Sequence, residues 1–224
     1  AHVLGILHTD KGGQEGVERK LDAKLDGATL RREVEVDGLR RILGSSGETG
    51  GGVIVTLTLI EELQRIVEEE LLAAVREHRP KWATVVVMDP DTGGILALAN
   101  WPSFDPNDPG RRPAMLNAAI AAPYEPGSQM KTFISAAALE EGVVRPDTVF
   151  DCENGLWKYG SRPPLHDHPY ARLPMSEAFA KSSNIFAAKL GILFLGTKRM
   201  HQWVRAFGFG ETTGIDLPGE SEGK

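Results

Sequence analysis

The spacing of hydrophobic residues changes along the 224-residue chain, and each change predicts a different element. Between residues 59 and 75, apolar side chains recur at intervals of three or four, which predicts an amphipathic helix that ends near His78. Thr58 and Glu61 have the spacing of a capping box, in which both side chains bond backbone N–H groups at the helix start. The acidic run 68–70 is expected on the solvated face. The face expected to be buried carries Leu59, Leu63, Ile66, Val67, Leu71 and Val75.

A hairpin follows this helix in the pattern. Residues 83–88 are apolar and rich in β-branched side chains, residues 89–94 are turn formers, and residues 95–99 are apolar again. This order predicts two antiparallel strands joined by a tight turn. A helix, a hairpin and then further helices favour an α+β fold, in which helices cover an antiparallel sheet.

The first part of the chain carries a weaker pattern. Residues 17–25 place apolar positions among charged ones and predict a short helix. Residues 31–43 alternate in part around an Asp-Gly pair, which predicts a hairpin. Residues 44–52 are rich in glycine and polar side chains and are expected to form a flexible linker. We therefore expect a module boundary after residue 52.

Two later apolar runs, residues 133–139 and 185–192, predict buried helices. Residues 101–112 and 151–173 follow no regular period and are expected to be irregular. Long loops of this kind often shape a substrate cleft in enzymes. The aromatic residues expected in the core of this part are Phe179, Phe186 and Phe194.

The composition narrows the class of protein. Hydrophobic residues make up 41% of the chain, which is enough for a packed core. The net charge of −6 argues against a nucleic-acid partner and against a strongly basic membrane-binding surface. The sequence holds no run of about 18 apolar residues, so it predicts no transmembrane helix. The single cysteine, Cys152, excludes a disulfide within the chain.

The start of the apolar run at 133–139 carries the most informative chemistry. Ser128 follows a Pro-Gly pair and precedes Lys131 by three positions, so the two side chains share one face of a helix. This arrangement suits a serine nucleophile activated by a lysine base. The pattern alone is expected about once by chance in such a chain, and it would then indicate a helix-start serine and a solvated lysine. Ser221 and Lys224 repeat it in a polar tail without helical periodicity.

A second polar triplet strengthens the enzymatic interpretation. Ser182 and Asn184 stand at the head of the second buried run. Serine and asparagine are also common helix caps, which is the alternative explanation. Two such triplets, each at the start of a buried helix, are what a serine acyltransferase needs. One supplies the nucleophile and base, and the other supplies a proton relay and an amide that holds the substrate.

These motifs and several other segments are similar to those of the class B penicillin-binding proteins, the D,D-transpeptidases that cross-link peptidoglycan. The similarity runs along nearly the whole chain, and the N-terminal part resembles the division-type branch more than the elongation branch. The other segments that carry the similarity are residues 1–5, 13–18, 57–59, 63–64, 151–155, 208–210 and 214–220.

The resemblance implies a fold and a cellular setting. Residues 1–52 would be the C-terminal part of a pedestal or linker module, and residues 53–224 the N-terminal part of the penicillin-binding transpeptidase domain. The family fold has a five-stranded sheet flanked by helices, of which this sequence carries two strands. The family also implies a membrane anchor before these residues and the last strands after them. The catalytic domain would lie on the extracytoplasmic side of the bacterial cytoplasmic membrane.

The resemblance also implies roles for the polar residues. Ser128 would attack the penultimate D-alanine of a stem peptide and form an acyl-enzyme, with its own N–H as one oxyanion donor. Lys131 would be the base, Ser182 the proton relay, and Asn184 the residue that holds the substrate amide. No cofactor and no metal are implied. The implied partners are stem peptides, β-lactams and the membrane proteins of the division or elongation complex, including a polymerising glycosyltransferase.

Three departures from the family pattern stand out. Gln129 follows the nucleophile where a small Thr or Ser is usual, and Ile60 stands where an Asp is common. The third family motif, Lys-Thr-Gly, is missing from the 224 residues, since the nearest match at residues 212–214 lacks the basic residue. Because that motif's strand supplies a cation and an oxyanion donor in the family, we expect this segment alone to be inactive or weakly active.

The residues also suggest other functions. His166, Asp167 and His168 with Cys152 suggest zinc ligands, but their spacing fits no standard site, so we expect no metal. A β-lactamase or β-lactam sensor of the same superfamily is the alternative enzyme, and it would differ by turning over penicillin. A non-catalytic scaffold of a cell-wall complex is the alternative without enzymatic activity.

Overall fold

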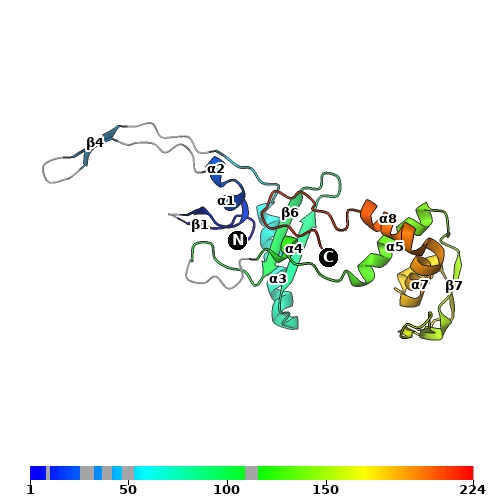
Figure 1. Cartoon of the computed structure of the whole chain (residues 1–224). Helices are drawn as coiled ribbons and strands as arrows, with labels where there is room; N and C mark the ends of the chain where they lie inside the picture. Colours follow the sequence, from blue (N-terminus) through cyan, green and yellow to red (C-terminus); the bar gives the residue numbers. More distant parts are fainter. Residues whose placement is uncertain (9–10, 26–32, 37–41, 47–52, 109–115, 224) are drawn as a thin grey trace. The chain divides into compact units, whose positions relative to one another are not determined.

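The computed structural model describes residues 1–8, 11–25, 33–36, 42–46, 53–108 and 116–223. The elements form two compact units (Figure 1). The first unit comprises residues 1–122 and 214–221, and the second comprises residues 123–213 and 222–224. Helices pack with antiparallel strand pairs, so the α+β class predicted from the sequence is confirmed.

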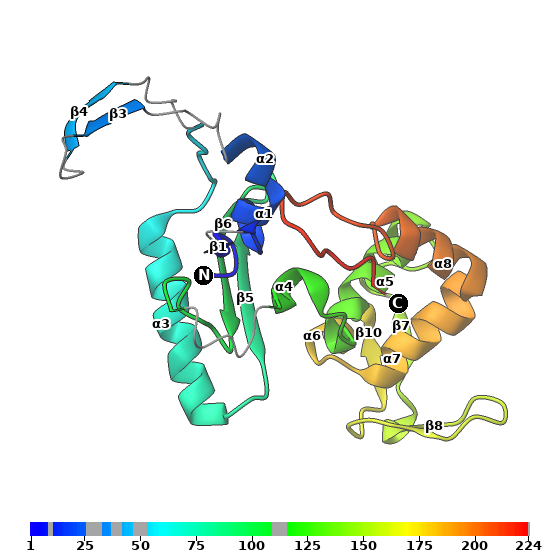
Figure 2. The ribbon, with the colours of Figure 1, turned by 60° about the vertical axis from the view of Figure 1, so that its left-hand side comes forward.

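The core of the first unit forms between one helix and one hairpin. Helix α3, Glu61–His78, lies along the antiparallel strands β5, Ala83–Met88, and β6, Ile95–Trp101 (Figure 2). The sequence predicted all three elements, although β6 extends two residues beyond the predicted end. The side chains buried between the helix and the hairpin are Val67, Leu71, Val75, Ala97 and Ala99.

Two expectations for α3 are wrong. Ile66 was placed on the buried face, yet it is 43% exposed. A two-stranded sheet covers only the narrow i, i+4 row of the helix that includes Val67, and Ile66 lies beside that row. The capping box also does not form, because the Thr58 hydroxyl donates instead to the Ile95 carbonyl at 2.6 Å. The adjacent strand thus competes with the helix end for this hydroxyl group.

The beginning of the first unit contains short elements. The predicted helix at 17–25 is present as two pieces, and the predicted hairpin is present with its second strand displaced into the segment expected to be a linker. The Asp-Gly turn of that hairpin lies outside the described residues, as does the expected module boundary. The elements are β1, Leu7–His8; β2, Gly12–Gly13; α1, Gly16–Lys20; α2, Asp22–Leu25; β3, Glu33–Val36; β4, Ile42–Ser46; and, later in the chain, α4, Ala118–Ala121.

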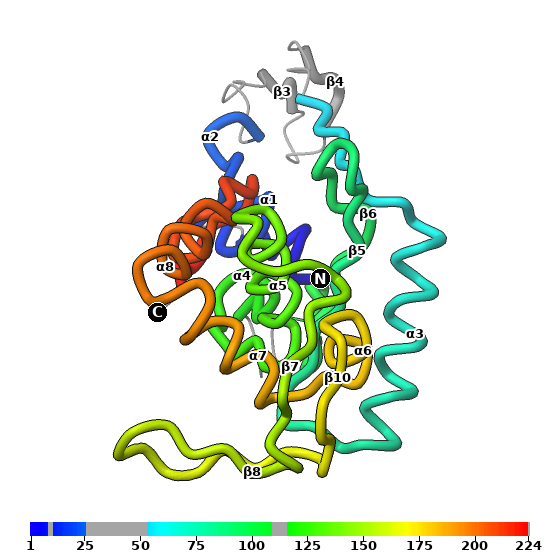
Figure 3. The backbone as a smooth tube through the Cα atoms, turned by 90° about the vertical axis from the view of Figure 1, so that its right-hand side faces the viewer, coloured from blue at the N-terminus to red at the C-terminus, as the bar shows by residue number. Residues whose placement is uncertain are grey.

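The second unit is built from helices and two short strand pairs (Figure 3). Its helical elements are η1, Gly127–Gln129; α5, Met130–Glu140; η2, Glu153–Gly155; α6, Met175–Ala180; α7, Asn184–Lys189; η3, Leu190–Leu195, a π-helical turn; and α8, Gly196–Ala206. Its strands are β7, Val149–Asp151, paired with β10, Arg172–Pro174, and β8, Leu156–Trp157, paired with β9, Leu165–His166. The segment predicted to be irregular, 151–173, contains the β8–β9 pair and is bounded by the β7–β10 pair, whose strands overlap its two ends.

The core of the second unit surrounds α7. Phe186 is fully buried, as predicted, and its ring meets the ring of Phe150 edge-on with centroids 4.8 Å apart. Phe179 and Phe194 are 40% and 38% exposed, so the expectation that they are core residues is wrong. The π-helical turn after α7 changes the helical register, which displaces Phe194 toward solvent from the face that a continuous helix would have given it.

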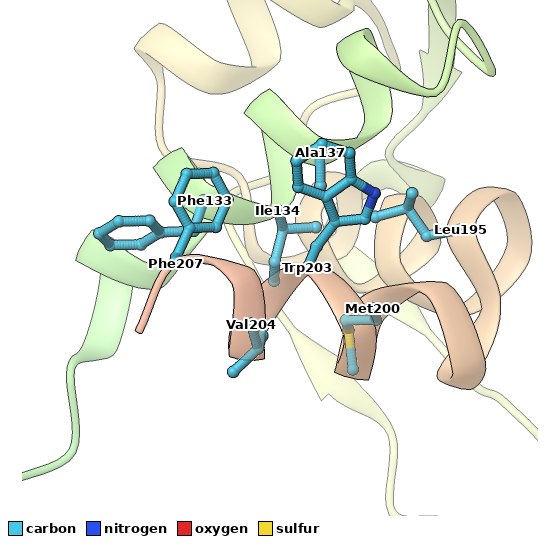
Figure 4. A pocket seen from close by; sticks show the side chains of 8 residues that line it. All are labelled: Phe133, Ile134, Ala137, Leu195, Met200, Trp203, Val204 and Phe207. Atoms are coloured by element: carbon cyan, nitrogen blue, oxygen red, sulfur yellow. The ribbon is translucent and has the colours of Figure 1, made fainter. Parts of the chain in front are cut away.

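Helices α5 and α8 pack side by side through apolar groups (Figure 4). Phe133 of α5 meets the rings of Phe207 and Phe209 edge-on, at 5.1 and 4.9 Å between centroids. The Trp203 indole N–H donates to Glu141 Oε1 at 2.8 Å. These contacts anchor α5, the helix that continues directly from η1. In the described residues, no helix has both the length and the hydrophobicity to cross a membrane.

Candidate active site

Ser128 lies in the turn η1, at the entrance to α5. Gly127 before it has φ of +56°, a conformation that glycine adopts without strain and that starts the turn. Ser128 is exposed, whereas Lys131 in the first turn of α5 is only 8% exposed. The serine hydroxyl is therefore open to solvent, and the amine lies below it in the protein.

The four residues singled out in the sequence come together at Lys131. Its Nζ contacts the Ser182 carbonyl at 2.5 Å, the Ser182 Oγ at 3.0 Å and the Asn184 Oδ1 at 2.7 Å. Ser182 Oγ lies 3.1 Å from Ser128 Oγ. Among the described residues, the amine is thus linked to Ser128 through the hydroxyl of Ser182 rather than directly.

Ser182 reaches Lys131 because of how α6 ends. Its φ is +54°, in the left-handed region, at the position just after the helix C-cap. The Ser182 N–H donates to the Phe179 carbonyl at 2.8 Å and the Ser183 N–H to the Ala178 carbonyl at 3.0 Å. This pair of bonds is a Schellman motif. Helices that end in this motif usually have glycine at the left-handed position. The turn lets α7 begin at once, so Ser182 and Asn184 lie close together.

Ser183, between these two residues, is the N-cap of α7. It is fully buried, and its Oγ accepts the Phe186 N–H at 3.2 Å. The same hydroxyl donates to Asp167 Oδ2 at 2.7 Å. Asp167 Oδ2 also accepts the N–H groups of Asn184 and Ile185, at 2.6 and 3.2 Å. The carboxylate therefore holds the first turn of α7 in place.

Sequence reasoning considered Asp167 only as a metal ligand and missed this contact. No local spacing could have revealed it, because the carboxylate reaches the helix from a distant loop. Within the described residues, no cluster of three or more His, Cys, Asp or Glu side chains is arranged to hold a metal ion.

Burial and charge shift both ionisable groups at this place. Burial lowers the pKa of Lys131 below its ordinary value, and the attraction of Asp167 opposes this only in part. Burial would raise the pKa of Asp167, but hydrogen bonds from Ser183, Ile185, His168 and Asn184 outweigh it and lower that pKa. The lowered pKa of Lys131 favours the neutral amine that a general base requires, and the ionised Asp167 offsets part of this effect.

An open cleft of about 480 Å³ lies over these groups. Its lining consists of Ser128, His166, Asp167, His168, Lys181, Ser182 and Asn184. Cys152 does not line the cleft; it is fully buried, with its sulfur 3.7 Å from the Ser183 hydroxyl oxygen. Burial raises the pKa of the Cys152 thiol, so it is not an activated nucleophile. The exposed hydroxyl in the cleft is accordingly the better nucleophile of the two.

The sequence of this chain is similar to those of known proteins. Residues 83–224 match the family described as the penicillin binding protein transpeptidase domain. The whole chain is 37% identical to the probable peptidoglycan D,D-transpeptidase PenA of Neisseria gonorrhoeae and 32% identical to the peptidoglycan D,D-transpeptidase FtsI of Escherichia coli strain K12. The chain spans 39% and 38% of the length of these two relatives.

Solved structures are also similar. A crystal structure of a putative peptidoglycan glycosyltransferase from Atopobium parvulum matches 99% of this chain over 50% of its own, with a TM-score of 0.81 and 26% identity. A peptidoglycan glycosyltransferase from Burkholderia ambifaria matches 75% of this chain over 50% of its own, with a TM-score of 0.67 and 28% identity.

Proposed function

This chain belongs to the family of penicillin-binding protein transpeptidase domains, and on that premise we propose that Ser128 is the nucleophile of a peptidoglycan D,D-transpeptidase. The observation that carries the proposal is the hydrogen-bonded series from Ser128 through Ser182 to the buried Lys131. The relatives named as D,D-transpeptidases support the same activity.

Proton transfer in the first step would run along that series. A neutral lysine amine has two hydrogens to donate and one lone pair. With those hydrogens directed to the Ser182 carbonyl and Asn184 Oδ1, the lone pair would accept the hydroxyl hydrogen of Ser182, whose oxygen lies 3.0 Å from Nζ. Ser128 would pass its proton to Ser182 as the hydroxyl proton of Ser182 moves to Lys131. The Ser128 oxygen then bonds to the carbonyl carbon of the penultimate D-alanine.

The later steps return the proton. The bond from that carbonyl carbon to the terminal D-alanine nitrogen breaks, and the leaving amine takes the proton from Lys131 through Ser182. An amine of a neighbouring stem peptide then attacks the carbonyl carbon of the Ser128 ester and forms the cross-link. The bond from that carbon to the Ser128 oxygen breaks, and the proton lost by the amine returns through Lys131 and Ser182 to the Ser128 oxygen. Water in place of the amine would make the reaction a carboxypeptidation.

Two groups would orient the substrate. Asn184 Oδ1 accepts from Lys131, which leaves the Asn184 Nδ2 hydrogens for a carbonyl of the stem-peptide backbone. The Ser128 backbone N–H would be one oxyanion donor. The strand with the third family motif, Lys-Thr-Gly, would supply a second, and these 224 residues do not contain that motif.

The cellular setting is part of the proposal. We place residues 1–52 in a pedestal or linker module and residues 53–224 in the transpeptidase domain, on the extracytoplasmic side of the bacterial cytoplasmic membrane. The proposed ligands are D-Ala-D-Ala stem peptides and β-lactams. The proposed partners are membrane proteins of the division complex, among them a polymerising glycosyltransferase.

A fluorescent penicillin tests the activity. The full-length protein should be labelled covalently in a one-to-one ratio, and Ser128→Ala should abolish the label because no ester can form. Denaturing gels read out the label, and Asp147→Asn, in an exposed ion pair, serves as a control for mutation itself. Continuous hydrolysis of the penicillin would identify a β-lactamase instead. Absence of label from a folded protein would favour the scaffold.

A further inference from the structure

Lys189, at the C-terminal end of α7, has no role in the chemistry above and is nevertheless buried. The residue is 9% exposed. Its Nζ donates to the Asp151 carbonyl at 2.7 Å and to Glu153 Oε1 at 2.6 Å, and it lies 5.6 Å from the centre of the Trp157 ring. The ammonium group therefore holds both the last carbonyl of β7 and a side chain of the segment that follows this strand.

The segment that Lys189 holds is strained. Glu153, Asn154 and Gly155 have successive φ values of +55°, +50° and +87°. Asparagine and glycine adopt this region readily, but glutamate does so only at a cost. Such conformations persist where surrounding contacts determine them, and they are common at functional sites. The two bonds from Lys189 reach the Asp151 carbonyl and the Glu153 side chain at the start of this turn, where the Glu153 N–H also donates to Asp151 Oδ1 at 2.8 Å.

The turn 153–155, held in this conformation, supports Asp167. The Asp167 N–H donates to the Gly155 carbonyl at 2.9 Å. A side chain at Gly155 would bring its Cβ to 2.7 Å from the Asp167 carbonyl oxygen, which shows how closely the two backbones approach. Asp167 in turn binds Ser183 and Asn184. The contacts thus form a closed path from the C-terminal end of α7 back to its N-terminal end, around the buried Cys152.

We propose that Lys189 is a positioning residue of the Ser128 site, which acts through the strained turn 153–155 on Asp167 and thereby on Ser182 and Asn184. The proposal rests on the proposed function only where it concerns the rate of acylation. A lysine that merely stabilised the fold would leave the first turn of α7 unchanged in a variant that still folds.

Hydrogen exchange of the full-length protein tests the path independently of activity. In Lys189→Met, the Asn184 and Ile185 amides should exchange about tenfold or more faster, because their acceptor loses its support. Lys189→Arg, which keeps the cation and its donors, should restore protection. Glu153→Gln, a milder change, should give an intermediate rate. Asp147→Asn should leave these amides unchanged. Wild-type protection in a folded Lys189→Met protein would overturn the proposal.

Acylation by fluorescent penicillin provides the second test. The rate at saturating penicillin should fall about tenfold to a hundredfold in Lys189→Met, as expected when reacting groups are displaced by an ångström or less. It should recover in Lys189→Arg. An unchanged rate in Lys189→Met, measured below its unfolding temperature, would overturn the proposal. If the wild-type protein itself is not acylated, the proposed function fails, while the exchange measurement still decides the role of Lys189.

Discussion

At the scale of single residues, Ser182 combines local strain with the geometry of the site. It occupies the left-handed position after α6, where helices commonly end on glycine. A non-glycine residue in that conformation loses roughly 1 kcal/mol. The same conformation turns its carbonyl and hydroxyl toward Lys131. Ser182 therefore lowers the stability of the fold at the position where the proposed relay needs a hydroxyl group.

Two substitutions separate these contributions. Ser182→Gly removes both the hydroxyl and the strain, whereas Ser182→Ala removes only the hydroxyl. The glycine variant should exceed the alanine variant in free energy of unfolding by about 1 kcal/mol. Both should be acylated roughly a hundredfold more slowly than the wild type, because the relay is lost. Denaturant titration and stopped-flow labelling measure the two effects. Equal stabilities would mean that position 182 is not left-handed.

Asp167 is expected to set the pH dependence of acylation. The proposed mechanism needs neutral Lys131, so the rate of acylation should rise with pH through the pKa of that amine. Asp167 raises this pKa against the lowering by burial. In Asp167→Asn the opposing charge is gone, so the acid limb of the pH profile should move to lower pH, even though the maximum rate falls with the weakened support of α7. An acid limb that stays in place or moves to higher pH would contradict this.

Asp167 is also expected to make the stability of the fold depend on pH. Its pKa is lower in the folded protein than in the unfolded chain. Its contribution is therefore present above the unfolded value of about 3.9 and is lost as pH falls through the folded value. In Asp167→Asn, the free energy of unfolding should therefore fall less steeply as the pH is lowered through this range. Glu177→Gln, in a more exposed ion pair, is the matched control and should not.

The sequence predicted which four polar residues would meet, and the physical reason is local. Ser128 and Lys131 share a helix turn, and Ser182 and Asn184 flank one N-cap, so their spacing alone constrains each pair. The contact between the pairs was known only from the resemblance. Asp167 and Lys189 were missed because they act where a long loop folds onto α7. The spacing of residues along the sequence does not predict such a contact.

At the scale of elements, α3 shows what periodicity can and cannot predict. The pattern located the helix, its end and the strands beneath it. It could not give the width of the surface that the helix covers, since that depends on how many strands lie below. Ile66 was misplaced for this reason. Thr58 was misassigned because a strand carbonyl, distant in sequence, accepts its hydroxyl.

A pair of truncations checks the observed face of α3. Val67→Ala should lower the free energy of unfolding by roughly 1–2 kcal/mol, since two buried methyl groups are lost against the hairpin. Ile66→Ala should change it by less than about 0.5 kcal/mol, because that side chain is largely solvated. Urea denaturation followed by circular dichroism measures both. A larger loss at Ile66 than at Val67 would show that the helix faces the hairpin differently.

At the scale of the whole molecule, all four candidate residues lie in the second unit, whereas the third family motif is not among these residues. In the proposed mechanism these residues would supply the nucleophile, the base and the relay, whereas the second cation and the second oxyanion donor would come with the Lys-Thr-Gly strand. A polypeptide of residues 1–224 should accordingly be labelled by fluorescent penicillin at least about a hundredfold more slowly than the full-length protein. Equal, Ser128-dependent labelling of the two would contradict this.

The buried position of Cys152 has a practical consequence. It is the only cysteine in the sequence, and its raised pKa leaves little thiolate for reagents to attack while the fold is intact. A cysteine introduced at an exposed position would thus take up a maleimide dye or a nitroxide selectively. Ser128→Cys would place such a reporter at the mouth of the cleft, where its mobility could be followed by spectroscopy. Labelling of Cys152 itself would show that the loop around it has opened, so the native thiol can report local unfolding.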